Sequence, residues 1–280
     1  MTISRRNGLL LAAGTLAATV STRPSQAQGN VRPGKITTAQ FDAWIALRGG
    51  DDGRPGYWYS DGLVRSMFDG VVESRMLGVE TWITPKELRT PTSAISLSRK
   101  VYFFLERDKD VAVLDKATGK PRAPSIYAYQ LRTFTLIDGV IDYKVESHDT
   151  RATRVGGAGS VYTITGGSGQ IHVNYAVFPT RPQTNGVRSG GGEVYDYFDH
   201  GPAIAEMPQR YQHTWAGANT AGSLSNMIGW RYPTFDAIPN EWLKVHIRKN
   251  GPMWVAPPKD MTEIETLRKT IPVKTGLIPA

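Results

Sequence analysis

The sequence predicts a mainly β protein built around a single antiparallel barrel. From about residue 57 to residue 200, about eight short runs rich in β-branched and aromatic residues recur at roughly ten-residue spacing. Glycine-rich turns separate these runs, and no helical period alternates with them. This pattern is typical of an antiparallel meander or barrel and argues against repeated β–α units.

Two hairpins are the clearest local signals. Asp138-Gly139 separates the β-rich runs 133–137 and 140–146, and Asp-Gly is well suited to a two-residue hairpin turn. Residues 115–119, Asp-Lys-Ala-Thr-Gly, predict a second hairpin loop, because aspartate opens turns and glycine accepts the positive φ that closes them. Further strands are expected at 99–107, 111–114, 161–165, 170–178 and 193–199, with exposed loops at 147–160 and 178–192.

Helices are predicted on either side of the strand region. A helix over 38–47 would end at Gly49-Gly50 and bury Phe41, Trp44, Ile45 and Leu47. A second helix is expected from Asp236 to Gly251, with Asp236 near its N-cap and Asn250-Gly251 as a left-handed stop. Its buried side would comprise Trp242, Leu243, Val245, His246 and Ile247. A short helix is expected near 262–269 in a tail that lies over the surface. The predicted architecture is thus a calycin-like antiparallel barrel with flanking helices.

The first 27 residues have the layout of a twin-arginine export signal. Arg5 and Arg6 are adjacent, residues 8–20 carry no charge, and Ser25-Gln26-Ala27 supplies small residues before a cleavage site. We therefore expect folding in the cytosol, a transient encounter with the twin-arginine translocase, cleavage after Ala27, and a periplasmic or secreted mature protein.

Residues 28–37 are predicted to be a flexible lead-in, residues 38–258 a single domain and residues 259–280 a tail.

The composition of the chain argues against several classes of function. Cleavage of the leader would remove three arginines, so the mature chain would hold 30 basic and 25 acidic residues, a net charge of +5. Its basic residues are scattered, which argues against nucleic-acid binding. No later run is long and apolar enough for a membrane span. Cysteine is absent, so disulfides, thiolate nucleophiles and thiolate metal sites are excluded.

The C-terminal half of the chain contains a series of distinctive motifs: Tyr197-Phe198-Asp199-His200-Gly201-Pro202, Met207-Pro208, Tyr211-Gln212, Trp215, Asn219, Gly229-Trp230-Arg231-Tyr232-Pro233, Ile238-Pro239 and Asn250-Gly251-Pro252. Together with the twin-arginine leader, these motifs resemble a bacterial family of exported proteins, domain of unknown function 1838. The resemblance covers most of residues 38–258. It implies a single β-rich domain. It implies no particular activity and assigns no catalytic residue.

Strand alternation selects the candidate site residues. In the run 170–178, His172 and Asn174 share a face, and two neutral hydrogen-bonding side chains suit a ligand cavity as well as they suit the solvent. The polar face of 140–148, with Asp142, Lys144 and Glu146, is expected to meet water. His200 is a candidate general base, although a turn-capping role is the competing interpretation.

Further candidates lie close by in the chain. His200 and His172 are the candidate acid–base groups, and Tyr197 and Asn174 would polarise a substrate oxygen. His213 and Trp230 would frame a pocket or pack in the core. Arg231 would anchor an anion, unless it makes a structural salt bridge. The five histidines show no metal-ligand spacing, and the two glycine-rich runs match no nucleotide-binding pattern, so neither a metal nor a cofactor is expected.

Two function classes remain open. The first is a cofactor-independent enzyme, a lyase, isomerase or hydrolase, acting on a small hydrophobic or aromatic molecule in the barrel cavity. The second is a periplasmic binding protein with the same cavity and no chemistry. A buried histidine paired to a carboxylate would favour the enzyme, whereas neutral polar groups among aromatics would favour the carrier. An envelope interaction module, with an exposed apolar patch in place of a pocket, is a third class.

Overall fold

The computed structural model describes residues 35–49, 53–66, 69–147, 160–167, 170–177, 192–199, 210–217 and 223–271. Between residues 160 and 217 it describes the strand backbones and the side chains of Ile164, His172, Val173 and Asn174. The predicted loops at 147–160 and 178–192 fall almost wholly outside these ranges.

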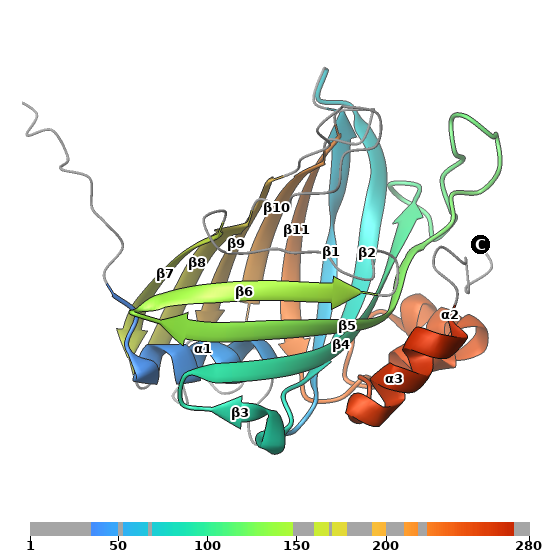
Figure 1. Ribbon diagram of the computed structural model, residues 1–280. Helices are drawn as coiled ribbons and strands as arrows, with labels where there is room; N and C mark the ends of the chain where they lie inside the picture. Colours follow the sequence, from blue (N-terminus) through green and yellow to red (C-terminus); the bar gives the residue numbers. More distant parts are fainter. Residues whose placement is uncertain are drawn as a thin grey trace, which may run out of the picture. The chain divides into compact units, whose positions relative to one another are not determined.

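One antiparallel sheet dominates the described chain, as the sequence predicted (Figure 1). Its strands follow the order β6-β5-β4-β2-β1-β11-β10-β9-β8-β7, and the short β3 pairs with β4. The strands are β1 (Gly56–Ser66), β2 (Val72–Ile83), β3 (Arg89–Thr90), β4 (Ser93–Leu105), β5 (Ser125–Ile137), β6 (Val140–Ser147), β7 (Ser160–Gly167), β8 (Gln170–Val177), β9 (Gly192–Asp199), β10 (Arg210–Gly217) and β11 (Ser223–Tyr232).

The α-helices of the described chain lie near its two ends. They are α1 (Thr38–Gly49), α2 (Glu241–Asn250) and α3 (Met261–Thr270). Two short 3₁₀ turns are η1 (Lys86–Leu88), between β2 and β3, and η4 (Pro252–Val255), between α2 and α3. Among the described residues, no helix combines the length and the apolar character needed to cross a lipid bilayer.

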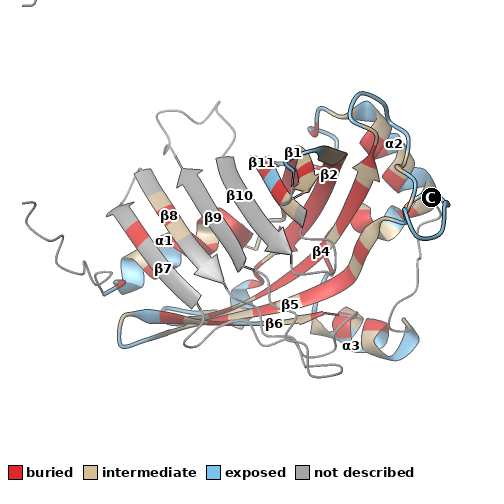
Figure 2. Ribbon diagram, turned by 90° about the horizontal axis from the view of Figure 1, so that it is seen from above, coloured by how far each residue is buried: buried red, intermediate tan, exposed pale blue. Residues whose placement is uncertain are grey.

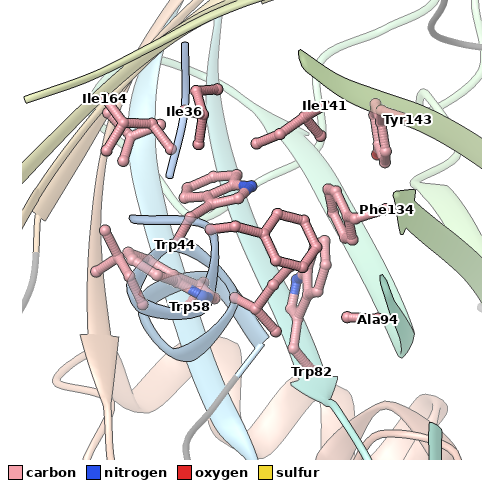
Figure 3. Packing of buried hydrophobic residues seen from close by; sticks show 13 residues of the cluster. Ile36, Trp44, Trp58, Trp82, Ala94, Phe134, Ile141, Tyr143 and Ile164 are labelled. Atoms are coloured by element: carbon pink, nitrogen blue, oxygen red, sulfur yellow. The ribbon is translucent and has the colours of Figure 1, made fainter. Parts of the chain in front are cut away.

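The sheet curls around α1. Trp44 of α1 packs in one buried cluster with Phe134 of β5, Ile141 of β6, Ile164 of β7 and Val173 of β8, so both ends of the strand order meet the same helix (Figure 3). Trp58 of β1 and Trp82 of β2 belong to this cluster and are fully buried. We call the sheet face that carries Trp58 and Trp82 the inner face, and the opposite face the outer face.

The predicted closed barrel is wrong, because β6 and β7 end the strand order and no ladder joins them among the described strands. Part of the hydrogen-bonding capacity of β7 is used by α1: the Gln40 Nε2 donates to the carbonyl oxygen of Ile164 at 3.2 Å. The helix thereby covers a strand that a barrel would have paired with a further strand.

The outer face is covered by the C-terminal segment, so the central strands are buried on both sides (Figure 2). Leu77, Val101 and Phe103 pack against Leu243 and Ile247 of α2. Farther along the outer face, Leu97 and Tyr129 pack against Ile264 and Leu267. The helix near 262–269 is thus confirmed as α3, and it belongs to the packed core instead of lying loosely over the surface.

A bulge in the β4–β5 ladder connects the sheet to the C-terminal segment that covers its outer face. The register shifts between Ser98 and Lys100, which leaves backbone carbonyls near the shift without regular ladder partners. The indole of Trp254 donates to the carbonyls of Lys100 and Tyr127 at 3.0 and 3.2 Å. Arg99 donates from Nε to the carbonyl of Ala128 at 3.0 Å. These bonds satisfy the bulge and tie it to the C-terminal segment.

Both predicted turns are confirmed, but the turn at 115–119 does not join two strands as predicted. Asp138 and Gly139 have φ values of 52° and 80°, the left-handed pair that a type I′ hairpin between β5 and β6 requires. Asp115 Oδ1 accepts from the backbone N–H of Ala117 and Thr118 at 3.0 and 2.9 Å, and Gly119 has φ 65°. This loop is flanked by isolated bridges instead of strands.

The helix predictions are confirmed except for the ends of α2. All four residues expected on the buried side of the first helix are buried in α1. The second helix begins at Glu241, because the Asn240 side chain caps it by accepting from the N–H of Leu243 at 2.8 Å. The predicted start at Asp236 is therefore wrong. Gly251 has φ −154°, so the predicted left-handed stop is also wrong, and Val245 is 60% exposed.

Candidate functional site: a buried charge cluster on the inner face

A buried carboxylate lies at the centre of the inner face. Glu80 of β2 is 4% exposed. Its Oε2 accepts from Arg48 Nη2 of α1 at 3.1 Å and from Trp82 Nε1 at 3.0 Å. Its Oε1 accepts from the Tyr102 hydroxyl and lies 3.9 Å from Lys100 Nζ. We refer to Glu80, Arg48, Lys100, Tyr102 and Arg132 as the Glu80 cluster.

Two guanidinium groups of the cluster lie over one indole ring. The Cζ atoms of Arg48 and Arg132 are 3.9 and 4.3 Å from the centre of the Trp82 ring. Arg132 also donates to the Tyr143 hydroxyl and to Gln130 Oε1, both at 2.6 Å, and its Nη2 is 4.0 Å from Glu80 Oε2. A guanidinium group that stacks on a buried ring and also donates hydrogen bonds through its N–H groups is held in one orientation.

The electrostatics of the cluster keep Glu80 charged. Burial by itself raises the pKa of Glu80, but Lys100, Arg48 and Arg132, with the Tyr102 hydrogen bond, outweigh burial and hold its pKa far below the ordinary value of 4.5. Glu80 therefore accepts hydrogen bonds as a carboxylate at physiological pH, and it has no proton to donate.

The local sequence explains how Tyr102 reaches the carboxylate. Gly78 precedes Glu80 by two residues on the same face of β2, and it pairs with Tyr102 in the β2–β4 ladder. A Cβ atom added at Gly78 would lie 2.3 Å from Cδ1 and Cε1 of the Tyr102 ring. The ring therefore occupies the space that any other residue at position 78 would fill.

Small residues and methionines continue the inner face beyond the Glu80 cluster. One row of the ladder across β2, β1 and β11 aligns Gly78, Ser60 and Gly229, and the next aligns Met76, Gly62 and Met227. Met76 and Met227 are buried in one cluster with Val64 and Tyr102.

Four buried hydroxyl groups on the inner face have no hydrogen-bond partner in the part of the chain that the structure describes. They come from four neighbouring strands: Ser98 of β4, Ser74 of β2, Ser60 of β1 and Ser225 of β11. None of these residues is more than 2% exposed. A buried polar group without a partner costs about 1–3 kcal/mol, so proteins rarely keep several on one surface.

The structure places three of the predicted site residues on the outer face, away from this cluster. His172 and Asn174 flank Val173, which belongs to the inner-face cluster around α1, so their half-buried side chains lie on the outer face. Trp230 also lies on the outer face, where its ring stacks on Tyr59 with the centroids 6.1 Å apart. The outer face likewise carries the polar residues of β6, where Glu146 pairs with Arg268 of α3.

Arg231 lies on the inner face and contacts the end of α1. Its Nη1 donates to the carbonyls of Ala46 and Leu47 at 3.1 and 3.2 Å. A cation that binds the last carbonyls of a helix is favoured by the helix dipole. These bonds favour the structural interpretation of Arg231, and its anchoring of an anion stays a prediction.

The remaining candidates are placed only in part. Tyr197 is the ladder partner of Val173 and Tyr211, and His213 is the ladder partner of Met227 and Tyr195. His200 lies outside the described residues. The catalytic roles of His200, His172 and Tyr197 therefore stay predictions, as do the binding roles of the other residues.

Sequence reasoning missed the Glu80 cluster, although one signal pointed to it. In the predicted strand 99–107, Val101, Phe103 and Leu105 share one apolar face, and the other face carries Lys100 and Tyr102. A strand whose second face alternates charged and aromatic residues is a candidate for burial on both sides. The partners of Glu80 come from three other elements, so no local pattern groups them.

The comparisons assign no relative to this chain. No family model matches it, and no curated protein or solved structure is significantly similar to it. Within the described part of the chain, no three His, Cys, Asp or Glu side chains are grouped so that they could hold a metal ion. The functional argument therefore depends on the geometry of the inner face.

Proposed function

We propose that the protein binds a small, partly hydrophobic or aromatic molecule on the inner face of its sheet. The observation that carries this proposal is the set of four buried serine hydroxyls that have no hydrogen-bond partner among the described residues, Ser60, Ser74, Ser98 and Ser225. A bound molecule with hydroxyl or carbonyl groups would supply the missing partners. Ser60 and Ser98 stand beside the Glu80 cluster in the ladder, and Ser74 and Ser225 flank Val64.

The surroundings of the serines suit such a ligand. Met76, Met227 and Val64 offer an apolar surface, and methionine side chains adapt to irregular shapes. The Glu80 cluster offers fixed charges and a tyrosine hydroxyl at one end of this surface. A few convergent polar groups beside an apolar surface are typical of small-molecule sites.

A pair of hydroxyl deletions tests the proposal. Native mass spectrometry of the exported protein identifies the co-purified molecule, and its affinity is then measured for the wild type and for the double variant Ser60→Ala, Ser225→Ala. If each hydroxyl bonds the ligand, the double variant loses on the order of tenfold or more in affinity, since a net hydrogen bond contributes about 0.5–1.5 kcal/mol.

The matched control is Thr81→Val. The Thr81 hydroxyl is also buried and has no hydrogen-bond partner among the residues described above, but Thr81 alternates with Glu80 and Trp82 and so lies on the outer face. This variant should bind the molecule as the wild type does. A protein that carries no molecule, or a double variant that binds as tightly as Thr81→Val, would contradict the proposal.

An acid–base enzyme using the same surface is the second candidate, and the Tyr102–Glu80 hydrogen bond favours it. A tyrosine hydroxyl held by an ionised carboxylate beside Lys100 is oriented for proton exchange with a substrate oxygen. Incubation of the bound molecule with wild type and with Tyr102→Phe distinguishes the two candidates. Conversion that depends on the hydroxyl supports the enzyme, and an unchanged molecule in both samples supports the carrier.

We further propose that the protein is exported through the twin-arginine route. A ligand held in a sheet that wraps a helix would be enclosed during folding or taken up after export. Because this route carries folded proteins, the inner face would already be assembled when the protein reaches the periplasm.

A further inference from the structure

A pocket lies at the end of β4, away from the inner-face serines. It has a volume of about 160 Å³ and is formed by the end of β4, the connection to β5 and α2. The residues that line it include Phe103, Phe104, Asp110, Arg122, Trp242 and His246.

Three aromatic rings form one wall of this pocket. Trp242 and His246 are one helical turn apart on α2, and their rings stack with the centroids 4.9 Å apart. The Phe103 ring meets both edge-on, with centroid distances of 5.5 Å to Trp242 and 5.0 Å to His246. Such a wall presents flat apolar surface to a planar ligand.

The pocket lining also includes a cation, Arg122. The Arg122 guanidinium lies over the Phe104 ring, with Cζ 3.6 Å from its centre. It forms no side-chain hydrogen bond or ion pair with any described residue. Burial lowers the pKa of Arg122, while the charges of Glu73 and Asp115 act weakly in the other direction. Asp110 also lines the pocket, but it is directed at Arg75, with 3.7 Å between Oδ1 and Nη1.

His246 adds a second polar group to the pocket. Its Nε2 is buried and accepts or donates no hydrogen bond within the described ranges of the chain. Burial, followed by the charge of Lys249, lowers the pKa of His246 below its ordinary value of 6.5, so the ring is neutral at physiological pH. The pocket thus combines an aromatic wall, a neutral imidazole and one unpaired cation.

We propose that this pocket binds a small aromatic carboxylate, with its ring against Phe103 and Trp242 and its carboxylate on the Arg122 guanidinium. The size agrees, because an apolar cavity of about 150 Å³ accepts a benzene ring. Arginine binds carboxylates through paired N–H groups, which leaves its face on Phe104 undisturbed. The proposal does not depend on the function proposed for the inner face.

Calorimetric titration of the mature chain with sodium benzoate tests the proposal, with benzamide as the uncharged ligand of the same shape. We expect benzoate to bind the wild type, and benzamide to bind on the order of tenfold or more weakly because it lacks the charge-assisted bond. Arg122→Met keeps the apolar stem and removes the charge, and it should weaken benzoate binding to the same extent.

The matched control is Arg107→Met, which removes an exposed arginine of the same connection that does not line the pocket. It should bind benzoate as the wild type does, and so should the Ser60→Ala, Ser225→Ala variant. Three results would overturn the proposal: no benzoate binding at millimolar concentration, equal binding of benzamide, or equal losses in Arg107→Met and Arg122→Met. If Arg122→Met fails to fold, the comparison of benzoate and benzamide binding to the wild type still tests the proposal.

Discussion

Tyr102 reaches the carboxylate of Glu80 by lying over Gly78, two residues before Glu80 on the same face of β2. The hydrogen bond therefore depends on the absence of a side chain at position 78. This relationship joins the backbone of one strand to the charge cluster that we place at one end of the ligand surface.

Gly78→Ala should displace the Tyr102 ring and break its bond to Glu80. Overpacking of this kind costs about 1–3 kcal/mol in the free energy of unfolding. Tyr102→Phe keeps the ring and removes only the hydroxyl, so it isolates the hydrogen bond. Because Gly78→Ala already breaks that bond, the double variant should lose less stability than the sum of the single variants. Urea denaturation of all four proteins measures the coupling, and strict additivity would contradict the relationship.

Glu80→Gln should destabilise the protein strongly and change how its stability depends on pH. Removing the carboxylate leaves the buried cations Arg48 and Arg132 without it, a loss of about 3–5 kcal/mol at neutral pH for such a pair. The pKa of Glu80 is lowered in the folded state, so its contribution is complete above its ordinary value of 4.5 and declines as the pH falls below that value.

Denaturation of the wild type and Glu80→Gln between pH 7 and pH 3 checks this sign. The difference between the two proteins should be largest at neutral pH and should shrink on acidification. A difference that stays constant over this range would mean that the folded protein does not hold Glu80 in its charged form.

Arg231→Met should loosen α1 from the sheet. The variant loses the hydrogen bonds to the carbonyls of Ala46 and Leu47, and bonds to a charged group contribute about 1.5–3 kcal/mol each in favourable cases. Amide hydrogen exchange should become faster in α1, while α2 keeps its protection. If ligand affinity falls and the protection of α1 is unchanged, Arg231 anchors the ligand and the structural interpretation fails.

The twin-arginine interpretation makes a separate prediction about export. Replacing Arg5 and Arg6 together by lysine should retain the protein in the cytosol with its leader uncleaved, since the translocase recognises the arginine pair. Arg23→Lys, in the same leader but outside the pair, should be exported normally and begin at Gln28 after cleavage. Fractionation and intact-mass measurement compare the two. Equal processing of both variants would exclude this route.

The parts of the fold that local chemistry decides could be predicted from the sequence. The Asp138-Gly139 turn needs two positive φ values, and α1 buries a stripe that its own spacing reveals. The start of α2 could not be located in the same way, because Asp236 and Asn240 are both good caps and tertiary packing selects Asn240. Local sequence also does not decide whether the sheet closes into a barrel, because this depends on whether α1 covers β7.

The candidate site escaped prediction for a related physical reason. Alternation sorts the residues of a strand into two faces but does not say which face is buried. In β6 the polar face lies outward, whereas in β2 and β5 the inner face carries Glu80 and Arg132. A charge is tolerated there only because its partners arrive from distant parts of the chain, and a sequence pattern within one strand cannot show them.

The most direct test of the central claim is a crystal structure of the protein purified after export from its own host. We predict density for an organic molecule on the inner face, within hydrogen-bonding distance of the Ser60 and Ser225 hydroxyls. An inner face filled by the protein's own side chains, with these hydroxyls bonded to protein atoms, would contradict the account.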